Sequence, residues 1–167
     1  MLIAPRDAYA ETLVELGAEN ENIVVLDADV AKASKTVLFK EKFPNRFFDL
    51  GISESDLICT GAGFALAGML PFVNAYGNFM LGNGWEQIKL SVCYANKNVK
   101  IVGHNIGASS GKDGPTHFCL EDIALMRVLP RMTVVEPADG VEMKKAVRAI
   151  AEHVGPVYLR VGRVPIP

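Results

Sequence analysis

The sequence is poor in cysteine, and its three cysteines, Cys59, Cys93 and Cys119, form no CxxC pair. This argues against a disulfide framework and favours reduced thiols in a cytosolic protein, with core packing as their default role. The net charge of −2 is spread without long runs of either sign, which excludes a basic nucleic-acid footprint or membrane patch. No apolar run approaches the roughly 18 residues of a membrane span, and no signal sequence is visible. We therefore expect a soluble, cytoplasmic protein.

Short apolar runs rich in β-branched residues alternate with longer segments of helical periodicity. This alternation is typical of a parallel sheet covered by helices on both faces. The sequence therefore predicts a single domain, 1–167, with an α/β fold of three layers (α/β/α) and a six-stranded, mostly parallel sheet. The expected strands are 22–28, 46–52, 71–76, 99–105, 132–137 and 156–161.

Capping signals and periodicity also predict helices. Gly17 suits the end of the first helix, and Ser53 with Asp56 resembles a capping pair. The expected helices are 5–16, 54–67, 84–94, 120–129 and 139–154, the last with an apolar stripe of Met143, Val147, Ile150 and Val154.

Glu54 follows an expected strand and opens a helix rich in glycine and alanine. A helix N-terminus favours a carboxylate through its exposed N–H groups and dipole, so one interpretation is an ordinary first-turn acid. The apolar run beside it supports another interpretation, because a carboxylate held out of water can share a proton with a bound base.

The longest segment without clear periodicity is 103–117, which has four glycines and two of the three histidines. A loop of this length after a strand end is usually functional or mobile. His104 and His117 have no third histidine or cysteine pair at ligand spacing, which argues against zinc. Each alone suits a hydrogen-bonding loop residue or a catalyst, whereas together they favour a substrate site.

Three familiar motifs are absent or incomplete. GAGFALAG (61–68) lacks the last glycine of a dinucleotide fingerprint, so its small residues indicate close backbone approach to the sheet or to a second subunit. GASSGK (107–112) is one residue too short for a phosphate-binding loop. No G-x-S-x-G elbow of a hydrolase is present.

Four stretches occur in a familiar order: GISESD (51–56), PFVNAYGNFM (71–80), VGHNIGASSGKDGPTH (102–117) and EDIALMR (121–127). Together they closely resemble the pyrimidine-binding domain of the transketolase family of thiamine diphosphate enzymes. The resemblance covers nearly the whole chain and agrees with the six expected parallel strands.

The resemblance implies that Glu54 matches the glutamate that hydrogen-bonds N1′ of the aminopyrimidine of thiamine diphosphate. Sharing a proton there favours the imino tautomer, whose exocyclic nitrogen can remove the C2 proton. Tyr76 and Phe79 fall on aromatic positions around the pyrimidine, where core packing is the alternative. Asp29 matches an acid near the cofactor and the dimer interface.

On the substrate side, His104 and His117 match histidines that face the sugar, and Asp113 matches an acidic residue near its hydroxyls. Their implied work is hydrogen bonding and proton transfer as a ketol unit passes from donor to acceptor. Arg160 and Arg163 are further candidates for holding a sugar phosphate, since a guanidinium forks well onto phosphate oxygens, with a solvated strand end as the alternative.

The resemblance also defines what this sequence does not contain: the diphosphate-binding domain, expected to hold Mg²⁺ on the partner, and the C-terminal domain of the family. We expect the first domain of a split transketolase's second subunit or a fragment of a longer enzyme. Either should be inactive alone, and should pair as a homodimer or heterotetramer with a diphosphate-binding partner.

Three alternatives remain open on the sequence. The chain could be the corresponding domain of a 1-deoxyxylulose-5-phosphate synthase, or of the E1 beta subunit of a 2-oxo acid dehydrogenase. A test of xylulose 5-phosphate against pyruvate as donor would separate these from a transketolase. The third alternative is a non-catalytic scaffold that keeps the fold.

Overall fold

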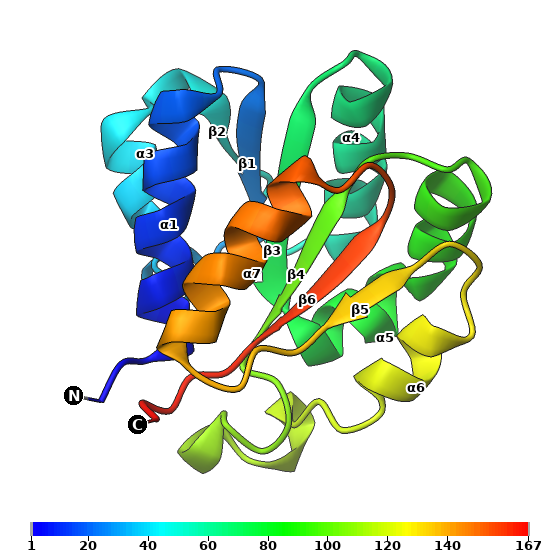
Figure 1. The fold of residues 1–167 in the computed structure, drawn as a ribbon. Helices are drawn as coiled ribbons and strands as arrows, with labels where there is room; N and C mark the ends of the chain where they lie inside the picture. Colours follow the sequence, from blue (N-terminus) through cyan, green and yellow to red (C-terminus); the bar gives the residue numbers. More distant parts are fainter. Residues whose placement is uncertain (1, 167) are drawn as a thin grey trace.

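A six-stranded sheet forms the centre of the computed structural model, which describes residues 2–166 (Figure 1). Neighbouring strands are all parallel, in the order β2-β1-β3-β4-β6-β5, so the expected fold class is confirmed. The strands are β1 (Ile23–Asp27), β2 (Phe47–Asp49), β3 (Leu70–Tyr76), β4 (Lys100–His104), β5 (Thr133–Val135) and β6 (Val157–Val161).

Helices cover both faces of this sheet (Figure 1). One face carries α1 (Pro5–Glu19), α3 (Val37–Lys42) and α7 (Gly140–Glu152), and the other carries α4 (Glu54–Leu66), α5 (Gly77–Gln87) and α6 (Asp122–Arg127). The shorter segments are α2 (Ala31–Ser34), a π-helical continuation of α5 (Ile88–Tyr94) and 3₁₀ turns at Pro44–Arg46, Gly111–Asp113 and Pro115–His117.

The side chains of each central strand alternate between two apolar cores. In β1, Val24 and Leu26 pack toward α4 and α5, whereas Ile23 and Val25 pack toward α1 and α7. Strands buried on both faces read as continuous apolar runs, which is why the sequence located them well. The edge strands β2 and β5 are only three residues long, shorter than expected.

Two expected helix ends were wrong. Helix α1 continues past Gly17 to Glu19, and Gly17 is a contact point, since a Cβ there would lie 2.5 Å from the Phe39 ring. Helix α7 ends at Glu152, so Val154 lies beyond it and is 83% exposed. The other three residues of the expected stripe are buried, as predicted.

Other differences concern helix starts. The helix expected at 84–94 begins at Gly77 and changes to π geometry at Ile88. The helix expected at 120–129 is limited to Asp122–Arg127. Ser53 does precede α4, but its side chain makes no capping hydrogen bond, so the capping pair is wrong.

The small residues of α4 act as expected at one position. A Cβ on Gly61 would lie 2.6 Å from the Val73 side chain, so this glycine lets α4 approach β3 closely. Cys93 and Cys119 are buried, whereas Cys59 is exposed and does not pack in the core. Within residues 2–166, every helix is too short or too polar to cross a membrane.

Candidate active site

The candidate site lies at the carboxyl ends of β1 and β3. After β1 the chain turns to one face of the sheet through α2 and α3, and after β3 it turns to the other face through α5. Parallel sheets bind ligands in the crevice opened by such a reversal. A cavity of about 230 Å³ occupies this place. Its lining residues are Ala28, Asp29, Val30, Ile52, Glu54, Tyr76, Phe79 and His117.

Glu54 is the first residue of α4, and its side chain is buried, with 5% exposure. Its Oε2 accepts a hydrogen bond from Asn83 Nδ2 at 3.1 Å. The preceding turn contains Gly51 at φ 72°, in the left-handed region that glycine adopts without strain. Of the two interpretations of Glu54, a solvated first-turn acid and a carboxylate kept from water, the geometry supports the second.

Three rings stand around the same cavity. The ring centroids of Phe79 and His117 are 5.0 Å apart, those of Tyr76 and Phe79 are 6.1 Å apart, and those of Tyr76 and His117 are 6.2 Å apart. The loop that carries His117 is tied to α5, because Asn78 Nδ2 donates to the Thr116 carbonyl oxygen at 2.7 Å. A flat, partly apolar ligand suits such a lining.

Two carboxylates shape the β1–α2 loop. Asp27 accepts from the Val30 amide at 2.6 Å and from Thr36 Oγ1 at 2.7 Å. Burial raises the pKa of Asp27 to about 6, although these hydrogen bonds oppose the shift. Asp49 accepts from the amide of Asp29, which has a φ of 58°.

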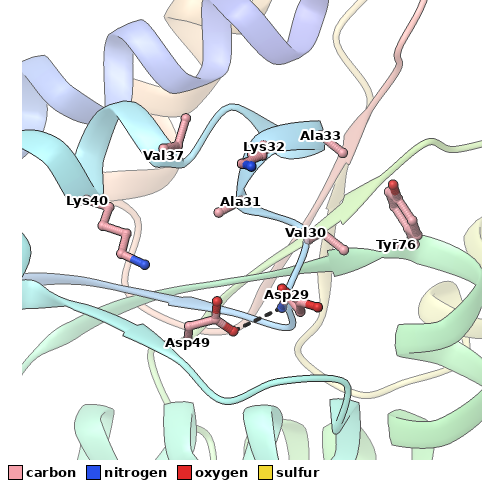
Figure 2. A pocket seen from close by; sticks show the side chains of 9 residues that line it. All are labelled: Asp29, Val30, Ala31, Lys32, Ala33, Val37, Lys40, Asp49 and Tyr76. Atoms are coloured by element: carbon pink, nitrogen blue, oxygen red, sulfur yellow. Dashed lines mark hydrogen bonds between the residues drawn. The ribbon is translucent and has the colours of Figure 1, made fainter.

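A second cavity of about 350 Å³ adjoins the first (Figure 2). The two cavities share Asp29, Val30 and Tyr76 in their linings. Figure 2 shows the Lys40 side chain extending from α3 into this space on the side of Asp49. The crevice therefore continues from the ring-lined cavity toward α2 and α3.

His104 is the last residue of β4 and does not line the ring-bearing cavity. Its Nε2 donates to Asn74 Oδ1 at 3.0 Å, because the amide of Asn74 already donates to two carbonyl oxygens and leaves Oδ1 as the acceptor. Burial, with a smaller contribution from Arg6, lowers the pKa of His104 to about 3. The histidine is therefore neutral near pH 7, and its Nδ1 has no partner among the described residues.

Arg160 is not a solvated strand end, which corrects one expectation. The side chain is 8% exposed; Nε donates to Asp122 Oδ2 at 2.7 Å and Nη2 to Asp122 Oδ1 at 3.1 Å. Its Nη1 donates to Glu136. A guanidinium with these bonds is already neutralised, so its geometry favours a structural ion pair over a phosphate contact.

Arg163 and Asp113, in contrast, lie at the surface and form an ion pair of 3.1 Å. Arg163 also lines a hollow of about 360 Å³ together with Arg6 and Lys112. Ser110, in the same lining, donates to the His117 carbonyl oxygen at 3.0 Å. A cationic hollow thus adjoins the loop that brings His117 to the ring-lined cavity.

Nothing in the sequence pattern singles out Arg6, Lys112 or Asn83. Asn83 lies in a glycine-rich stretch that was expected to precede a helix, and Arg6 lies within the expected helix 5–16. Only the folded chain brings them beside the candidate residues. No group of three or more metal-ligating side chains occurs within residues 2–166.

Comparison with known protein families identifies the family of this chain. The family model described as the pyrimidine binding domain of transketolase matches residues 2–166. This chain belongs to that family. Membership confirms the resemblance carried by the four sequence stretches, and it implies dependence on thiamine diphosphate.

The pyrimidine-binding domain is similar to curated proteins of two organisms. It is 44% identical over 158 residues to a Methanocaldococcus jannaschii protein described as a transketolase C-terminal section, covering 95% of this chain and 50% of that protein. It is 39% identical over 160 residues to the 6-deoxy-6-sulfo-D-fructose transketolase subunit of Clostridium sp. strain MSTE9, covering 96% and 50%. The chain thus spans about half the length of these relatives.

The fold of the pyrimidine-binding domain also occurs in solved structures. One, described as a split gene transketolase in an inactive beta4 tetramer, superimposes with a TM-score of 0.88 at 45% identity. The similarity covers 99% of this chain and 53% of that chain. The sheet order and both helical layers are therefore shared with a transketolase polypeptide.

Proposed function

We propose that this chain is the pyrimidine-binding part of a transketolase. The complete enzyme transfers a two-carbon ketol unit between sugar phosphates, using thiamine diphosphate, in cytoplasmic carbohydrate metabolism. A diphosphate-binding subunit or domain completes the site, with Mg²⁺ on that partner. The assembly is a homodimer of a longer chain or a heterotetramer of two subunits. Relatives that are twice as long support a role within a larger assembly.

One observation carries this proposal: a buried carboxylate and three rings share one small cavity at the reversal of strand order. Tyr76 and Phe79 offer the apolar and π surfaces that a flat pyrimidine ring needs. Glu54 offers an acceptor for a protonated ring nitrogen. The lining therefore fits the aminopyrimidine end of the cofactor, and a scaffold would have no use for this combination.

Glu54 would act by sharing a proton with the pyrimidine nitrogen N1′. Because the carboxylate lies at a helix start and is buried, its orientation does not depend on solvent rearrangement. When bound, thiamine diphosphate supplies the C2 carbon nucleophile of ketol transfer. The rings of Tyr76 and Phe79 hold the heterocycle against Glu54 and exclude water from it.

His117 is the candidate for proton transfer to the sugar, since its ring faces the cavity. His104 is a weaker candidate, because a pKa of about 3 keeps it from donating a proton as an imidazolium near pH 7. Asp113 would accept hydrogen bonds from sugar hydroxyls, and Arg163 would attract the phosphate. Arg160 would instead support the fold around Asp122, while Asp29 would border the cofactor.

The test is Glu54→Gln in the assembly reconstituted with a diphosphate-binding transketolase subunit. We expect the rate of C2 proton exchange of the cofactor to fall by about 100-fold or more, because the amide cannot share the proton. Asp56→Asn, which changes an exposed acid in the same first turn of α4, should leave exchange unchanged. Exchange that survives Glu54→Gln at the normal rate would refute the assignment.

A further inference from the structure

Asn83 makes the sole hydrogen bond that Glu54 receives from another side chain within residues 2–166. The amide Nδ2 lies 3.1 Å from Glu54 Oε2. A carboxylate only accepts hydrogen bonds, so the amide of Asn83 must present its NH₂ group and not its oxygen. The other carboxylate oxygen, Oε1, has no partner in the described chain and is left for a ligand.

The fold holds Asn83 at this position from both sides. Gly84, the next residue, packs on the first turn of α4, where a Cβ would collide with Ile58 Cδ1 and lie 3.4 Å from the Glu54 carbonyl oxygen. On the other side, Trp85 Nε1 donates to the Leu125 carbonyl oxygen at 3.3 Å and so links α5 to α6. With its backbone fixed in this way, the short side chain of Asn83 is within hydrogen-bonding distance of Glu54.

Asn83 is itself exposed on the outer side of α5. A hollow of about 440 Å³ on the outer side of α5 is lined by Asn83 but not by Glu54. The carboxylate instead lines the ring-bearing cavity on the opposite side. Asn83 therefore contacts Glu54 from the side away from the ring-lined cavity.

We infer that Asn83 is a positioning residue for Glu54: its amide fixes Oε2 and so directs Oε1 to the cofactor nitrogen. This inference rests on the proposed function and adds a residue to that site. A hydrogen bond to a charged group is stronger than one between neutral groups, so its removal should affect the chemical step measurably.

The test compares Asn83→Asp, Asn83→Ala and Asn83→Gln in the assembly reconstituted with a diphosphate-binding subunit. Asp keeps the size but removes the donor and adds a like charge, so we expect C2 exchange to slow by about tenfold or more. Ala should slow it by a smaller factor, and Gln, which keeps the donor, should restore part of the rate. Cofactor affinity should change by less than about threefold, because the partner holds the diphosphate.

The matched control is Gln87→Ala, four residues later on the same helix and in the lining of the same hollow. It should leave the exchange rate unchanged. If C2 exchange is lost in Glu54→Gln but proceeds at the wild-type rate in Asn83→Asp, this inference is overturned and the proposed function stands. Loss of cofactor affinity and of stability together, in every Asn83 variant, would also overturn it, since that pattern marks a purely structural residue. An assembly in which Glu54→Gln has no effect would overturn both.

Discussion

Buried polar side chains at the carboxyl edge of the sheet differ in how completely they are satisfied. Asn74 uses both ends of its amide, since it donates to two carbonyl oxygens and accepts from Tyr9 and His104. Arg160 is paired with two carboxylates. His104 retains one unpartnered nitrogen, and the low dielectric around it favours the neutral ring.

The burial of His104 predicts that the stability of the protein depends on pH through this residue. Its pKa in the folded state is about 3, below the ordinary value of 6.5, so its stabilisation is complete above pH 6.5 and is lost as the pH falls toward 3. Between pH 7 and pH 5, the free energy of unfolding of the wild type should fall by about 2 kcal/mol relative to His104→Gln. Urea denaturation at both pH values measures this difference.

Asp27 changes stability with pH in the opposite direction, because its pKa is raised to about 6 and its contribution grows as the pH falls. It is present in both proteins, so its contribution cancels in the comparison. A difference between wild type and His104→Gln that does not depend on pH would contradict the neutral, buried assignment of His104.

Single residues were predicted well where the family motif and local geometry agree. The sequence placed Glu54 at a helix start, Tyr76 at the end of a strand and Phe79 just beyond it, and all three line one cavity with His117. Their chemical roles stay predictions. The partners of Arg160 could not be predicted, because Asp122 and Glu136 come from other elements and only packing brings them together.

At the scale of elements, α5 depends on glycines that a helix would normally avoid. Gly77, Gly82 and Gly84 weaken its helix propensity, so the sequence pattern indicated a later start at residue 84. Tertiary contacts override that preference: a Cβ on Gly77 would lie 2.9 Å from Cys119 Sγ, and one on Gly84 would meet Ile58. The helix is thus held by close packing against its neighbours.

Two of these glycines form a matched pair for a stability test. Gly84→Ala should lower the free energy of unfolding by about 1–3 kcal/mol, because the added methyl overpacks the contact with α4. Gly82→Ala, in the same helix with open space around it, should raise stability by about 0.5–1 kcal/mol through helix propensity. Thermal or urea unfolding of the chain measures both, and equal effects would contradict the packing explanation.

At the scale of the whole molecule, the strand order determines where the ligand crevice lies. The order β2-β1-β3 makes the chain leave neighbouring strand ends toward opposite faces and so opens the crevice. Under the proposed function, the cavity there would hold only the pyrimidine end of the cofactor.

This arrangement predicts that cofactor affinity depends on the partner. Calorimetry of this chain with thiamine diphosphate should give weak binding, and adding a diphosphate-binding transketolase subunit with Mg²⁺ should tighten it by at least about tenfold, or about 1.4 kcal/mol. The physical reason is that the second polypeptide supplies the charges that hold the diphosphate. Equal affinity with and without that subunit would contradict a divided site.

The sequence alone determined the alternation of strands and helices, because burial on two faces and helical periodicity are local patterns. It also placed the ends of the four inner strands to within one residue, and these ends meet at one edge of the sheet. Only the tertiary structure decided that Asn83 donates to Glu54, that His104 is buried and that Arg160 forms an ion pair with Asp122. Those outcomes depend on how closely segments far apart in the chain approach one another, and side-chain packing sets that distance.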